Sequence, residues 1–95
     1  MFWHVGTFTK AASLSNTLSI AEDALARAHF QVFFNAQQGG FIVIGGNAQV
    51  IVSISCAPQD SGTFVAVTAT SDNSSAAEQA RNQVRQLIQE IVIFD

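Results

Sequence analysis

Charge is scarce in this sequence. Charged residues make up 12% of the 95 residues, about half of the roughly 25% that is typical of soluble domains. The formal net charge is −3, and the four cations, Lys10, Arg27, Arg81 and Arg85, are scattered along the chain. A nucleic-acid-binding surface needs clustered cations to displace the counterions of the phosphates. The composition therefore predicts that nucleic acid is not a partner.

Cysteine is nearly absent as well. The single cysteine, Cys56, excludes an intramolecular disulfide and a cysteine-based zinc cluster. Cys56 alternates with apolar residues at the end of a strand-like run, so we expect a buried and unreactive thiol. The two histidines, His4 and His29, do not stand at a spacing typical of metal ligands. We therefore expect no metal site and no cofactor.

Long hydrophobic runs are missing too. The longest unbroken apolar runs, such as Phe41–Ile44, are far shorter than the about 20 residues needed to span a bilayer. The first ten residues, MFWHVGTFTK, lack the basic start and the apolar core of a signal peptide. These absences predict a soluble, cytoplasmic protein without a membrane partner.

What is present between residues 31 and 70 is a series of short apolar runs. A chain of this length forms one domain, so residues 1–95 are taken as a single unit. The runs are separated by turn signals, which predicts an antiparallel meander. We expect the glycine pairs at 39–40 and 45–46 to provide positive φ angles for tight turns, and Pro58 to end the third strand. The four runs cover 31–36, 40–44, 49–56 and 63–70.

The segments before the meander predict one strand and one helix. Residues 2–9 are rich in β-forming residues, with Gly6 marking a bulge or a close backbone approach. Apolar residues from Leu14 onwards recur at helical spacing and predict a helix over about 16–29. His29 would lie in its last turn, where a positive charge suits the carbonyl end.

The start of this helix has an alternative. Ser19 and Glu22 stand three residues apart and have the form of a capping box, which would begin the helix at Ile20.

The C-terminal segment predicts a second helix over about 76–92. Ser75 and Glu78 form a capping-box pattern, and an apolar stripe follows over four turns. Residues 91–94 alternatively form a short strand, but the apolar stripe favours the helix.

The element order is therefore β-α-β-β-β-β-α, with one strand fewer if the two glycine-rich runs form one hairpin arm. Two amphipathic helices around a meander predict an α+β two-layer sandwich. Its sheet would have four or five mainly antiparallel strands, with both helices on one face, and the architecture would have ferredoxin-like character.

Strand alternation predicts which side chains the helices leave uncovered. In 31–36, Val32, Phe34 and Ala36 share the core face and Phe33 points away. The same alternation in the later runs completes a back face without charged side chains, a composition that is common at interfaces. We therefore predict an interface for a homodimer formed by sheet stacking; the alternative is that loops or the N-terminal segment cover this face. The predicted interface residues are Phe33, Ile51, Ser53, Phe64 and Ala66.

Two functions of different class are compatible with these patterns. The first is a non-catalytic interaction or small-molecule-binding domain that self-associates through its sheet. The alternative is a small enzyme with a site between helix and sheet near Trp3, His4, His29 or Cys56. No catalytic residue is assigned, because no nucleophile and base stand in a recognisable pattern.

Overall fold

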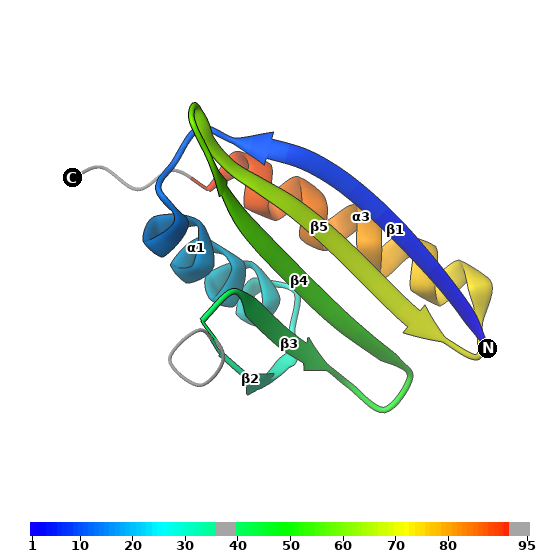
Figure 1. Cartoon of the computed structure of the whole chain (residues 1–95). Coiled ribbons are helices and arrows are strands. Elements are labelled where there is room, and N and C mark those ends of the chain that lie inside the picture. Colours follow the sequence, from blue (N-terminus) through cyan, green and yellow to red (C-terminus); the bar gives the residue numbers. More distant parts are fainter. Residues whose placement is uncertain (36–39, 92–95) are drawn as a thin grey trace.

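The computed structural model describes residues 1–35 and 40–91, which form a five-stranded sheet with helices on one of its faces (Figure 1). This arrangement confirms the predicted α+β architecture. The elements are β1 (Phe2–Lys10), α1 (Leu14–Arg27), β2 (Gln31–Phe34), β3 (Ile42–Gly46), β4 (Val50–Gln59), β5 (Gly62–Ser71) and α3 (Ser74–Glu90).

The strands lie in the order β1-β5-β4-β3-β2, and every neighbouring pair is antiparallel. Strands β2 to β5 form the predicted meander. The first strand pairs with the last, so α1 crosses the sheet from one edge strand to the other (Figure 1). The ferredoxin-like comparison is not confirmed, because α3 follows the last strand and does not connect two strands.

The core lies between the helix layer and one face of the sheet. Helix α1 packs on β2, β3 and β4, while α3 packs on β1 and β5. Each strand contributes alternate residues to this layer, as period-2 geometry requires. The largest fully buried apolar side chains are Ile20 and Leu25 of α1, Val43, Val52, Ile54, Val65 and Val67 of the sheet, and Val84 and Ile88 of α3.

Helix α1 begins two residues earlier than predicted. Ser13 is its N-cap, and the Ser13 side chain accepts a hydrogen bond of 3.1 Å from the Asn16 backbone N–H. The alternative cap at Ser19 is wrong, because Ser19 lies inside the helix. Several serines along this segment can act as caps, and the position where the chain leaves β1 selects Ser13.

The end of α1 also differs from the prediction. His29 lies beyond the last turn with a φ of 66°, in the left-handed region. The His29 N–H donates to the Ala26 carbonyl (3.0 Å) and the Phe30 N–H donates to the Leu25 carbonyl (2.9 Å). This pair of bonds is the Schellman motif, in which glycine is usual at the position that His29 occupies.

Helix α3 begins and ends two residues before its predicted bounds. Asn73, not Ser75, is the N-cap, and its side-chain oxygen accepts a hydrogen bond of 3.1 Å from the Ala76 N–H. At the other end, Ile91 has extended backbone angles, so the helical hydrogen bonds stop at Glu90. Residues 92–94, which the predictions assigned to a helix end or a strand, lie outside the described residues.

The glycine pair at 45–46 does not form a turn, contrary to the prediction. Both residues belong to β3, where a Cβ on Gly45 would lie 2.7 Å from the Gln31 carbonyl oxygen and one on Gly46 would collide with the Val50 carbonyl oxygen. Asn47 makes the turn instead, because its side-chain oxygen accepts from the Gln49 and Val50 N–H groups. Gly40 has the expected positive φ of 77°, and residue 39 lies outside the described residues.

Pro58 does not end its strand. It pairs with Thr63 inside β4, which continues to Gln59 and a two-residue hairpin loop. The Cys56 N–H donates to the Phe41 carbonyl on the β3 side, so Pro58, two residues further on, also directs its nitrogen away from β5. Proline is tolerated at this position because no hydrogen bond of the β4–β5 ladder needs its missing N–H.

The alternation predicted for β2 fails after Val32. The register shifts there, so that Val32 lies opposite Gly45 and Phe34 lies opposite Ile44. Adjacent residues of β3 point to opposite faces, and Phe34 is therefore not on the core face with Val32. Residue 36 lies outside the described residues.

Candidate functional site: the uncovered sheet face

The face of the sheet opposite the helices is the most distinctive surface of the molecule. We call it the open face and define it by the residues that alternate with the core residues along the five strands. None of its members is charged: most are apolar or carry a hydroxyl group, and Gln31 and Gln59 carry neutral amides. They are Trp3, Val5, Thr7 and Thr9 of β1, Gln31, Phe33 and Phe34 of β2, Ile42, Ile44 and Gly46 of β3, Ile51, Ser53, Ser55, Ala57 and Gln59 of β4, and Phe64, Ala66, Thr68 and Thr70 of β5.

The five residues predicted for the interface all lie on the open face. Phe33 and Ile51 are each 53% exposed, and Phe64 is 37% exposed. Such large apolar side chains are expected to be covered in a functioning protein when several of them share one surface. Residues 2–10 form an edge strand of the sheet, so the N-terminal segment does not cover this face.

Sequence reasoning missed the contribution of β1 to the open face. Trp3 is 68% exposed and Val5 is 41% exposed, and both belong to it. The alternation of Trp3 and Val5 with His4 and Gly6 was the available signal, but it does not say which of the two sets faces the helices.

The open face combines apolar and hydroxyl side chains within single rows across the sheet. One row across the sheet runs from Val5 through Thr68 and Ser53 to Ile44, so in this row the small hydroxyl residues lie on β5 and β4 between larger apolar residues on β1 and β3. Hydroxyl groups in the middle of the row supply hydrogen-bond donors and acceptors without charge. The chemistry of this surface therefore suits a neutral protein surface.

The opposite face of β1 is covered by α3, residue by residue. Nε2 of His4 lies 3.1 Å from Oγ of Ser74, and the Arg85 guanidinium lies 5.8 Å from the centre of the Phe8 ring. Between these contacts, Nη1 of Arg81 donates to a backbone carbonyl of β1. The helix is thus attached along the whole length of the edge strand.

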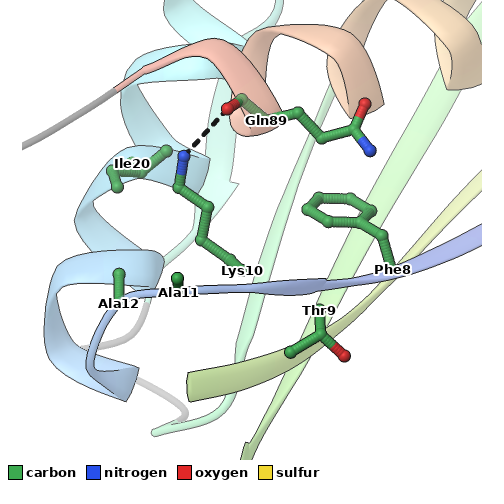
Figure 2. A pocket seen from close by; sticks show the side chains of 7 residues that line it. All are labelled: Phe8, Thr9, Lys10, Ala11, Ala12, Ile20 and Gln89. Atoms are coloured by element: carbon green, nitrogen blue, oxygen red, sulfur yellow. Dashed lines mark hydrogen bonds between the residues drawn. The ribbon is translucent and has the colours of Figure 1, made fainter. Parts of the chain in front are cut away.

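Lys10 completes this row of contacts at the end of α3. Its ammonium group donates to the carbonyls of Gln89 (3.0 Å) and Ile91 (2.6 Å), where a cation is favoured by the helix dipole. Partial burial lowers the pKa of Lys10. Figure 2 shows the lysine crossing to the last turn of α3, with the Phe8 ring beside it. The hollow here has a volume of about 380 Å3 and is lined by Phe8, Thr9, Lys10, Ala11, Ala12, Ile20 and Gln89.

The structure does not bring the candidate catalytic residues together. Cys56 is buried, and burial raises the pKa of its thiol to about 11, so the thiolate is a minor species at neutral pH. Phe8 lies across β5 from Cys56, and His4 is four residues further along β1, about 13 Å in the strand direction. The side chain of Trp3 lies on the opposite face of the sheet from that of His4. His29 lies at the C-terminal end of α1, where its backbone N–H caps the helix. Cys56, His4, Trp3 and His29 therefore do not form one shared site.

Among residues 1–35 and 40–91, no group of three or more His, Cys, Asp or Glu side chains is placed to hold a metal ion. In the same part of the chain, no helix is long and apolar enough to cross a membrane.

Comparison of the sequence with protein-family models and with curated proteins found no match.

Proposed function

We propose that this protein is a non-catalytic interaction domain that forms a homodimer through its open face. The observation that carries the proposal is the combination of exposed Trp3, Phe33 and Ile51 with the absence of charge on all five strands of that face. An open antiparallel sheet in water normally places polar or charged residues on its solvent side.

A second copy of the chain is the partner that this chemistry favours. In a two-fold interface each patch meets the same patch, so any charge near the axis meets its own sign. The open face avoids that repulsion because it carries no charge, and a hydroxyl such as that of Ser53 or Thr68 can pair with its symmetry mate. A charged partner would find no complementary charge here.

The area of the open face is somewhat below that of a standard dimer interface. Strands β4 and β5 have ten residues each and the shorter outer strands widen the sheet, which gives about 600–700 Å2 of planar area. Standard interfaces bury about 800 Å2 on each partner. Burial of about 500 Å2 of apolar surface contributes about 12 kcal/mol, against an association cost of about 4–15 kcal/mol. The balance indicates moderate affinity, so dimerisation is expected to depend on concentration.

The test is the solution mass, measured by light scattering or sedimentation from about 1 µM to about 1 mM, a range that spans moderate dissociation constants. We expect a monomer–dimer equilibrium for the wild type and a folded monomer for Phe33→Asp. Ser15→Asp is the matched control, because it adds the same charge to an exposed site on α1. A wild type that stays monomeric throughout, or a Phe33→Asp variant that dimerises like the control, contradicts the proposal.

A second candidate role is suggested by the hollow beside Lys10. Its volume is within the range of small-molecule sites, and its lining combines the Phe8 ring with the ammonium of Lys10. We propose a small carboxylate with an apolar body as its ligand. Titration with benzoate should shift the amide resonances of Ala11, Ala12 and Gln89 saturably, whereas neutral benzamide should not. Equal responses to both probes, or shifts elsewhere, contradict this role.

A further inference from the structure

We propose that Arg81 prevents another strand from pairing with the free edge of β1, and that self-association of the chain is thereby confined to the open face. The second half of this inference rests on the proposed function; the first half does not. Edge strands offer unpaired N–H and C=O groups that can pair with another chain, so a nine-residue edge such as β1 needs a device that prevents this.

The hydrogen-bond alternation shows which groups of β1 are free. The Cys56 N–H donates toward β3, so Ser53, three residues earlier, directs its backbone groups toward β5 and pairs with Thr68. Thr68 therefore directs its own backbone groups toward β4 and not toward Val5, its neighbour in β1. The N–H and C=O of Val5 consequently point away from the sheet, along the free edge.

Arg81 occupies one of these outward-pointing acceptors. Its Nη1 donates to the Val5 carbonyl over 3.2 Å, and Val5 lies near the middle of β1. By the same alternation, the backbone groups of Trp3 and Thr7 are the next free ones on either side. An added strand needs a continuous ladder past these positions, so it would have to displace the guanidinium and remove its charge from water.

Gly6 allows the arginine to lie this close to the strand. A Cβ at Gly6 would be 3.0 Å from Cδ of Arg81 and 3.0 Å from Cδ of Arg85, closer than side-chain atoms normally approach. The register of β1 with β5 is continuous through Gly6, so the glycine does not mark a bulge. Its role is to make room for the aliphatic parts of both arginines, of which Arg81 reaches the Val5 carbonyl at the edge and Arg85 lies over the Phe8 ring.

The other edge is protected differently. Strand β2 has four residues, and its register shifts between Val32 and Phe34. Short length and an irregular register both discourage the addition of a strand. With both edges unsuited to pairing, the open face is the part of the sheet that remains available to a second copy.

The experiment combines solution mass with the emission of Trp3, the single tryptophan. For the wild type we expect a dimer whose Trp3 emission shifts to shorter wavelength as concentration rises, because stacking removes the indole from water. For Arg81→Ala we expect species larger than the dimer that grow with concentration. Arg27→Ala removes the same charge from an exposed site on α1 and should behave like the wild type.

Two further variants keep the test decisive if Arg81→Ala folds poorly by circular dichroism. Gly6→Ala should displace Cδ of Arg81, weaken its hydrogen bond to Val5 and produce the same growth without a change in the sequence of α3. Arg81→Lys keeps a cation and a donor, and should restore wild-type mass.

The possible failures are separable. If folded Arg81→Ala and Gly6→Ala both have the wild-type mass at every concentration, closure of the edge by Arg81 is wrong. If the wild type dimerises with Trp3 fully exposed and is indifferent to Phe33→Asp, confinement to the open face is wrong. If the wild type is monomeric but Arg81→Ala grows, self-association through the face fails while closure of the edge stands.

Discussion

The Lys10 ammonium donates a hydrogen bond of 2.6 Å to the carbonyl of Ile91, which joins the end of the first strand to the end of the last helix. A second bond, to Gln89, satisfies another carbonyl that the helix leaves without an internal partner. The Lys10 side chain thus caps the C-terminal end of α3 and holds the helix against β1.

Replacement of Lys10 should loosen this junction. Lys10→Met keeps the apolar stem and removes the donors, and we expect it to lower the free energy of unfolding by about 1 kcal/mol. Lys10→Arg retains a cation and donors and should lose less. Urea denaturation followed by circular dichroism measures both. Equal stability of Lys10→Met and the wild type contradicts a capping role.

Cys56 should make the folded state sensitive to alkaline pH. Its folded pKa of about 11 lies above that of an exposed thiol, so the unfolded chain releases the proton first. Stability should therefore fall as pH rises from about 9 through 11, by about 2–3 kcal/mol in total. The lowered pKa of Lys10 acts in the opposite direction, so the comparison with Cys56→Val, which lacks the thiol, isolates the effect.

In that comparison, the difference in unfolding free energy between wild type and Cys56→Val should be constant below about pH 8 and change above it. The sequence has no tyrosine, so no phenol titrates in the same range. A difference that is flat up to pH 11 contradicts the buried thiol, as does rapid labelling of Cys56 in the folded protein.

His29 should be replaceable by glycine with a gain in stability. Its φ of 66° is costly for a residue with a Cβ, and its backbone closes α1. We expect His29→Gly to stabilise the protein by about 0.5–1 kcal/mol, and His29→Ala, which keeps the strain, to give no gain. Thermal unfolding of the three proteins distinguishes them. An equal gain in stability for His29→Gly and His29→Ala would show that loss of the imidazole, and not relief of backbone strain, causes the gain.

Ile54 and Ile51 of β4 allow the core face and the open face of the sheet to be compared by the same substitution. Ile54 is fully buried and Ile51 is 53% exposed, three residues apart in β4. Ile54→Ala should cost about 2–5 kcal/mol of unfolding free energy, as buried truncations do. Ile51→Ala should leave the monomer's stability nearly unchanged and weaken dimerisation. Similar losses of monomer stability would mean that the open face is part of the core.

Alternation predicted β4 and β5 well. Ile51 and Ser53 of β4 and Phe64 and Ala66 of β5 lie on the face for which they were predicted, because successive residues of a strand point to opposite faces and these runs are regular. The same rule failed in β2, where a register shift that depends on the partner strand moved Phe34. Regular alternation along a strand therefore predicts which sheet face each side chain is on, but the prediction fails where the strand pairing shifts locally.

Helix existence was predictable, whereas the caps were not. The apolar stripes identified both helices, but serine and asparagine side chains compete as caps along the segments that precede them. Ser13 and Asn73 were selected because they stand where the chain leaves β1 and β5. That position depends on the length of each strand, which is set by pairing with distant residues.

By itself, the sequence determined the α+β class, the meander, the two helices and the absence of charge on the meander strands, because these follow from local period and composition. The tertiary structure decided that Trp3 and Val5 join the open face, since β1 takes its orientation from β5, more than fifty residues away. It also decided that Arg81 reaches the Val5 carbonyl. Contacts between distant segments depend on how the elements pack, and spacing along the chain does not encode that packing.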